Sequence, residues 1–150
     1  MTILSYAIQI LRMLNATNGG DFVYKYLQIH VQYFQRGIIA HKECSEVQKY
    51  EFTDDKYYFN NTLDYLKKDL DKVLSLLTRC VGSYIQVSRY EIDNSDRSVE
   101  NQVFYFEYVN GHFNGTKNGN SWNVVEYSNK EMKLSEVKKT IIDFFSSGLK

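Results

Sequence analysis

The stretch YVNGHFNGTKNGNSWNVVEY, residues 108–127, contains the dipeptide Asn-Gly three times within ten residues. Asn-Gly is a strong signal for a two-residue β-hairpin turn, because both residues tolerate positive φ angles. A turn at Asn110-Gly111 places Val109 opposite His112, and a second turn at 118–119 pairs Lys117 with Asn120. The middle dipeptide then lies inside a short strand, where Gly115 indicates a bulge. We interpret the three dipeptides as scaffold, belonging to an antiparallel meander.

Two further segments extend this meander toward the N-terminus. SYIQVSRYEI, residues 83–92, and SVENQVFYFEYV, residues 98–109, are rich in β-branched and aromatic residues. The turn-forming sequence DNSDR separates them. Together with the short strand that contains 114–115 and the strand SWNVVEY, residues 121–127, they predict a four-stranded antiparallel β-meander over about residues 83–127.

The clearest helical pattern precedes the meander, in residues 53–82. Steps of three and four residues align one apolar stripe, which consists of Phe59, Leu63, Leu66, Leu70, Val73, Leu77 and Cys80. Such a stripe is typical of a helix packed on a sheet or a helical core, although half of a coiled coil has the same period. Gly82 is expected to end the helix.

Two more helices are expected before residue 38, and one after the meander. Ile3, Ala7, Ile10 and Leu14 share one helical face, and Val23, Leu27, Val31 and Phe34 recur at helical spacing in residues 21–37. Alternation with a period of two also fits part of 21–37, so a strand is the alternative there. Residues 38–52 have no clear pattern. Near the C-terminus, Leu134 and Ser135 are expected to begin a helix that buries Val137, Ile141 and either Phe144 or Phe145.

These elements predict one α+β domain over residues 1–150, with N-terminal helices, then the four-stranded meander, then a C-terminal helix that covers the sheet. The chain has 18 basic and 18 acidic residues and no basic stripe, so a nucleic-acid partner is not expected. Cys44 and Cys80 fit reduced core residues, and the N-terminal residues lack the features of a signal peptide or membrane span. We therefore expect a cytoplasmic protein without a membrane partner.

No motif in the sequence indicates a cofactor, a metal or a catalytic site. NGTKNGN lacks the spacing of a phosphate-binding loop, and the pair His41 and Cys44 is a weak basis for a metal site. Asp69 and Asp71 point in different directions on a helix, so they cannot form a catalytic pair. We predict neither cofactor nor metal.

Tyrosine is unusually abundant, with 13 residues in the chain. Tyrosine combines a large contact area with a polar tip and is enriched at protein interfaces, although AT-rich coding also raises its frequency. We select Tyr57, Tyr58 and Tyr65 as the residues that bind a partner.

Size, aromatic content and the lack of a catalytic motif favour a small non-enzymatic binding protein. Such a protein acts by occluding a protein partner, as bacterial toxin-immunity proteins and phage-encoded inhibitors do. One alternative is a homo-oligomeric structural or accessory subunit, such as a homodimer, that associates through the 59–80 stripe. The other is a small enzyme whose site is assembled from scattered residues around His112, with Asn114 and Asn123 nearby.

Overall fold

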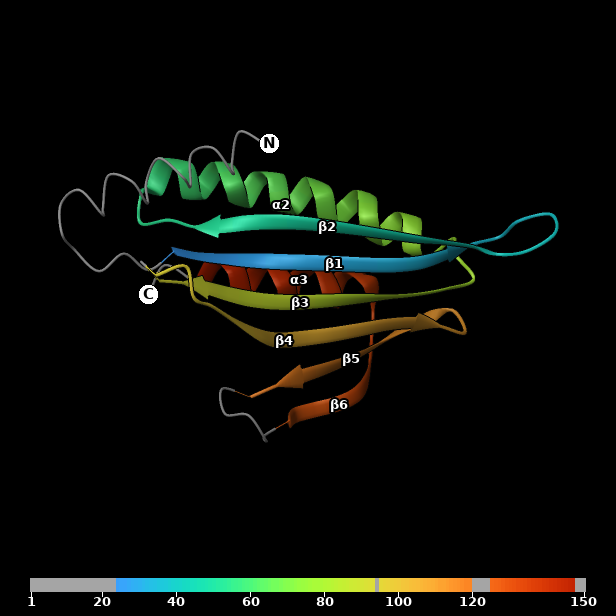
Figure 1. The fold of residues 1–150 in the computed structure, drawn as a ribbon. Coiled ribbons are helices and arrows are strands. Elements are labelled where there is room, and N and C mark those ends of the chain that lie inside the picture. Colours follow the sequence, from blue (N-terminus) through green and yellow to red (C-terminus); the bar gives the residue numbers. More distant parts are fainter. Residues whose placement is uncertain (1–23, 94, 120–124, 148–150) are drawn as a thin grey trace.

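A computed structural model of the chain describes residues 24–93, 95–119 and 125–147. The expected first helix, with Ile3, Ala7, Ile10 and Leu14, lies outside these residues. The described residues form one antiparallel sheet of six strands and two helices, α2 and α3, in a broadly α+β arrangement (Figure 1). The strand order is β2-β1-β3-β4-β5-β6. The prediction of a four-stranded meander was therefore wrong. The sheet has two more strands, which come from residues 24–52, a region that was expected to be helical or was left unassigned.

Strand β1, Tyr24–Gln35, occupies the segment for which a helix was expected. Leu27, Ile29, Val31 and Tyr33 alternate along it and face the core. The helix prediction was wrong because β1 lies inside the sheet, hydrogen-bonded to β2 on one side and β3 on the other. Aromatic and β-branched residues favour such a strand, and its partners come from distant parts of the chain.

Strand β2, Lys42–Phe52, forms from residues without a clear sequence pattern. It pairs only with β1 among the described strands and lies at the edge of the sheet. Most of its side chains are exposed, whereas Tyr50 is buried. An edge strand needs little apolar alternation, which explains why its pattern is weak.

Helix α2, Lys56–Leu77, confirms the helical pattern. Asp55 caps its N-terminus by accepting hydrogen bonds from the backbone N–H groups of Tyr57 and Tyr58. The buried residues are Phe59, Leu66, Leu70, Leu74 and Leu77. The helix ends at Leu77 with Thr78 as its C-cap, earlier than expected, so Cys80 lies beyond it.

Strands β3, Gly82–Ile92, and β4, Ser98–Val109, lead into the first Asn-Gly turn. Val109 pairs with His112, and both turn residues have positive φ, 53° at Asn110 and 86° at Gly111. This hairpin to β5, His112–Asn118, is as predicted, and its two positive φ angles are those of a type I′ turn.

The two-residue turn expected at Asn118-Gly119 was wrong, because Asn118 is a paired residue of β5. Lys117 pairs with Tyr127 rather than Asn120, and Asn118 pairs with Val125, so β6 spans Val125–Met132. The expected bulge at Gly115 instead falls on β6, where Asn129 has a φ of 52° and its N–H donates to Thr116. Gly115 is needed for packing, since a Cβ there would lie 2.5 Å from the sulfur of Met132.

Helix α3, Leu134–Ser146, begins immediately after β6, with Lys133 rather than Ser135 as its N-cap. It buries Val137, Ile141 and Phe145, as the sequence predicted. Buried residues of both helices belong to one core cluster with the inward side chains of the sheet, so α2 and α3 cover the same face. In Figure 1, α2 runs along the β2 edge and α3 lies behind β1 and β3.

Candidate functional site

Three tyrosines project from the outer side of α2. The exposed fractions of Tyr57, Tyr58 and Tyr65 are 70%, 63% and 66%. Residues 58 and 65 are two helical turns apart and lie on one line along the helix. The ring of Tyr57 lies edge-on to that of Tyr58, with 5.6 Å between centroids. We call these three residues the tyrosine patch.

The inner side of the same helix holds this patch in place. Phe59, directly after the two neighbouring tyrosines, stacks on Phe145 of α3 at 4.9 Å between ring centroids. Leu66, directly after Tyr65, is completely buried. With Asp55 capping the helix, the backbone beneath the patch is fixed at its start and along its length. The three rings are therefore presented on a rigid element.

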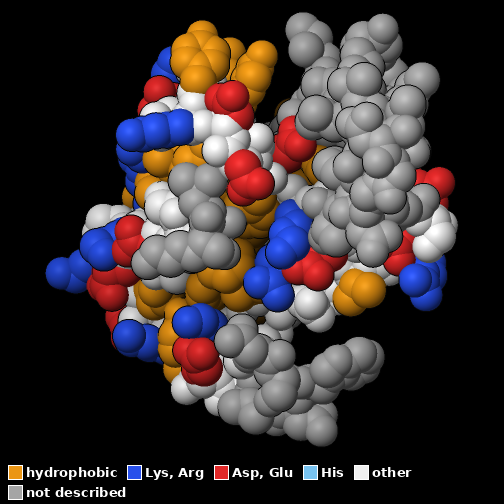
Figure 2. Space-filling model, turned by 90° about the vertical axis from the view of Figure 1, so that its left-hand side faces the viewer, with side chains coloured by type: hydrophobic (Ala, Val, Ile, Leu, Met, Phe, Trp, Pro, Cys, Tyr) orange, Lys and Arg blue, Asp and Glu red, His pale blue; other side chains and the backbone are white. Residues whose placement is uncertain are grey.

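Charges near the start of α2 have both signs. Figure 2, which views the molecule from the end where α2 begins, shows Lys and Arg side chains interspersed with Asp and Glu over the described surface. Hydrophobic side chains lie between them. The described surface at this end therefore does not have a strong electrostatic field of one sign.

Polar contacts join α2 to the sheet and to α3. The hydroxyl of Tyr50 donates to Asp69 Oδ2 at 2.6 Å, and Asp71 forms an ion pair with Lys138 at 2.5 Å. Burial raises the pKa of Tyr50, and the hydrogen bond to Asp69 raises it further. Asp69 and Asp71 serve different partners, as their helical positions predicted. They act as links between elements.

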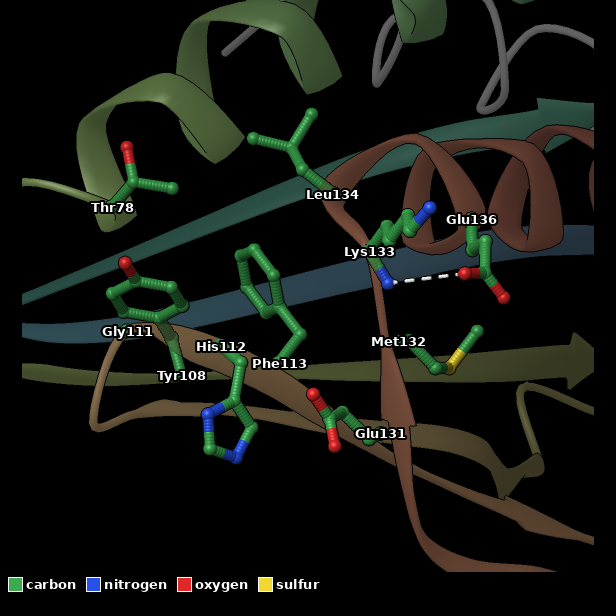
Figure 3. A pocket seen from close by; sticks show the side chains of 10 residues that line it. All are labelled: Thr78, Tyr108, Gly111, His112, Phe113, Glu131, Met132, Lys133, Leu134 and Glu136. Atoms are coloured by element: carbon green, nitrogen blue, oxygen red, sulfur yellow. Dashed lines mark hydrogen bonds between the residues drawn. The ribbon is translucent and has the colours of Figure 1, made fainter.

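A groove of about 550 Å³ lies at the end of the sheet where β4 turns into β5. Its apolar lining comes from Tyr108, Phe113, Met132 and Leu134, and its remaining residues are Thr78, Gly111, His112, Glu131, Lys133 and Glu136. Figure 3 shows the side chains of Phe113 and Leu134 facing the space between the sheet and the end of α2. We call this feature the hairpin groove.

His112, the residue considered as a base in the enzyme hypothesis, points out of the apolar part of this groove. It alternates with Phe113 along β5, so the two side chains lie on opposite faces of the sheet (Figure 3). Glu131 is on the same side as His112. The imidazole of His112 forms no hydrogen bond or ion pair with any described residue. Asn114 lies on that outer face too, and Asn123 is outside the described residues.

The other histidines and the cysteines are separate from the groove. His41 lies in the exposed loop after β1, and the ring of His30 hydrogen-bonds to Ser45 at 2.8 Å. Both cysteines are free and partly buried, and burial raises the pKa of the Cys80 thiol, followed by the charge of Cys44. Within the described ranges, no three His, Cys, Asp or Glu residues are grouped to hold a metal ion.

The face of the sheet opposite the helices is polar, which the sequence interpretation missed. One register row crosses all six strands and consists of Ser45, Gln32, Tyr84, Glu107, Asn114 and Glu131. Each strand contributes only one residue to this row, so no single segment of the sequence contains a pattern that predicts it. It becomes visible only when the strand order and register are known.

The sequence matches no protein-family model, and it has no significant match among curated proteins or solved structures. No helix in the described part of the chain is long and apolar enough to cross a membrane.

Proposed function

We propose that this chain is a non-enzymatic binding protein that occludes a protein partner through the tyrosine patch on α2. The observation that carries the proposal is the exposure of three tyrosines, each above 60%, on a helix whose opposite side is buried. Rigid aromatic side chains lose little conformational entropy on binding and account for much of the energy of many interfaces. A toxin-immunity protein or a phage-encoded inhibitor is the class of protein that fits this description.

The buried stripe of α2 argues against the homo-oligomeric alternative in the form that the sequence suggested. Phe59, Leu66 and Leu70 are at most 3% exposed, and they face the sheet and α3 of the same chain. A coiled coil through this stripe would expose the core. Association of copies through the 59–80 stripe is therefore not proposed.

The test is partner capture with substitutions in the patch. The triple variant Tyr57→Ala, Tyr58→Ala, Tyr65→Ala is expected to weaken the partner complex by about 30-fold or more, since a single interface anchor often contributes 2 kcal/mol. Tyr127→Ala is the matched control, because it removes a partly buried tyrosine from β6 at the other edge of the sheet. Pull-down with the wild-type protein identifies the partner, and titration calorimetry gives each affinity.

Substitutions of the reactive side chains separate binding from catalysis. His112→Ala, His41→Ala and Cys44→Ser are each expected to leave both partner affinity and biological activity at the wild-type level. If one of them abolished activity while folding and affinity remained intact, the enzyme hypothesis would replace the binding one.

A further inference from the structure

The loop between β1 and β2 carries the most exposed apolar side chains of the described chain. Ile38 and Ile39 are 106% and 98% exposed, as open to solvent as in an unfolded peptide. In Figure 1 this loop extends past the ends of α2, β3 and β4. Isolated exposed apolar residues are common, whereas these two adjacent isoleucines form a continuous apolar surface at a projecting turn. We call residues 36–42 the isoleucine tip.

The tip is a tight bend with a basic flank. A Cβ at Gly37 would collide with the carbonyl oxygen of Ala40, so the chain folds back closely at this point. Arg36, His41 and Lys42 flank the two isoleucines, and residues 35–42 contain no acidic residue. An apolar centre flanked by the charges of Arg36 and Lys42 is complementary to an apolar cavity with a negative rim.

The hairpin groove of the same protein has these properties. Tyr108, Phe113 and Leu134 form its apolar wall, with 4.8 Å between the ring centroids of the first two. Its charged residues are Glu131, Lys133 and Glu136. Glu136 accepts a hydrogen bond from the backbone N–H of Lys133, and Glu131 lies at the rim of the groove, on the side of His112 (Figure 3). The volume of about 550 Å³ is within the range of cavities that enclose small ligands, which is enough space for aliphatic side chains.

We propose that the occupant of the hairpin groove is the isoleucine tip of a second copy of this chain. Both features lie at the end of the sheet where β1 and β4 finish, so two copies that meet end to end about a two-fold axis make the contact twice. Each tip and groove then needs to bury only half of the roughly 1,200–2,000 Å² that a specific interface requires. The tyrosine patch begins at the other end of α2 and stays accessible. The dimer goes beyond the proposed function and does not depend on it.

Sedimentation velocity over roughly 1–300 μM protein tests the dimer directly. The wild-type protein is expected to show a concentration-dependent dimer. The double variant Ile38→Asp, Ile39→Asp is expected to raise its dissociation constant by on the order of 100-fold, since both apolar anchors are lost. Val99→Asp is the matched control, because Val99 is a 54% exposed aliphatic residue at the start of β4, and this variant keeps the dimer. All substituted side chains are exposed, and circular dichroism verifies their folding.

Charge reversal tests the pairing of tip and groove. Arg36→Glu with Lys42→Glu in one protein, and Glu131→Lys in another, are each expected to weaken self-association about tenfold or more. Mixing the two proteins pairs an acidic tip with a basic groove, and a native basic tip with a native acidic groove. The mixture is therefore expected to form a heterodimer more readily than either variant forms a homodimer.

Three results would overturn the proposal. They are a wild-type monomer at every concentration, a dimer that survives Ile38→Asp with Ile39→Asp, and a mixture that associates no better than its components. A monomer that binds vesicles of phosphatidylcholine and phosphatidylserine through the two isoleucines would assign the tip to a membrane surface instead. The triple tyrosine variant is expected to retain the dimer, so failure of the partner experiment and failure of the dimer experiment are distinguishable.

Discussion

Gly111 has a conformation that few other residues adopt. Its φ of 86° closes the β4–β5 hairpin, and no heavy atom lies within 4 Å of where its Cβ would be. We expect Gly111→Val to destabilise the protein by about 1–3 kcal/mol, through backbone strain alone, because β-branched residues resist positive φ. Urea denaturation measures the change. Gly82→Ala is the control, since Gly82 has free space and an ordinary φ. Equal stability of Gly111→Val and wild type would rule out the strained turn.

Glu51 makes the stability of the fold depend on pH. Burial raises the pKa of this side chain from 4.5 to about 7, and it lies opposite Tyr26 on the sheet. The folded protein therefore retains a proton that the unfolded chain loses above its ordinary pKa. The free energy of unfolding should fall as the pH rises from about 4.5 through 7, by about 1–3 kcal/mol after allowance for partial solvent screening.

The variant Glu51→Gln tests this dependence. Glutamine resembles the protonated side chain at every pH, so much of the decline between pH 5 and 8 should disappear and the variant should be the more stable protein at pH 8. Denaturant titrations across this range measure the effect. Glu107→Gln, which removes an exposed carboxylate from the same sheet face, should keep the decline. A decline that persists in Glu51→Gln would assign it to another group.

At the scale of the element, α2 depends on its buried side. Leu70 is 2% exposed within the core. Leu70→Ala should lower the free energy of unfolding by about 2–5 kcal/mol, since the truncation leaves a cavity between helix and sheet. Lys68→Ala, on the exposed side of the helix, should change it by less than about 0.5 kcal/mol. Thermal and chemical denaturation measure both variants, and equal losses in the two would show that α2 is not anchored through Leu70.

The elements differ in how strongly neighbouring residues specify them. The hairpin at 110–111 and the apolar faces of α2 and α3 depend on residues within a few positions of one another, and the sequence predicted these elements. β1 was mistaken for a helix because Leu27 and Val31 fit a period of four as well as a period of two. The pairing with β2 and β3, which the local pattern does not contain, decides between the two states.

For the whole molecule, the position of β1 predicts slow folding. β1 pairs with β3 across α2, and the paired residues are separated by about 50–70 positions in the chain. The loop must close before these contacts form, so we expect folding in milliseconds to seconds instead of microseconds. Stopped-flow dilution from urea measures the rate. Complete folding within the instrument dead time would mean that the β1–β3 pairing does not limit the reaction.

The candidate sites also differ in whether the sequence alone could indicate them. Tyr57, Tyr58 and Tyr65 were chosen from the sequence because tyrosine is abundant, and all three rings are exposed on α2. Their role in binding a partner stays a prediction. Neither the isoleucine tip nor the hairpin groove could be chosen in this way. Ile38 and Ile39 resemble core residues in a sequence, and Tyr108, Phe113 and Leu134 meet only after the strands and α3 have assembled.

The sequence by itself therefore determined the elements that local periodicity and turn chemistry specify, namely α2, α3 and the Asn110-Gly111 hairpin. The tertiary structure decided the state of β1, the existence of the β2 edge and the register of Lys117 with Tyr127. It also decided which apolar residues remain exposed. The physical reason is that backbone turns and amphipathic helices depend on neighbouring residues, whereas strand pairing and burial depend on residues that are distant in the chain.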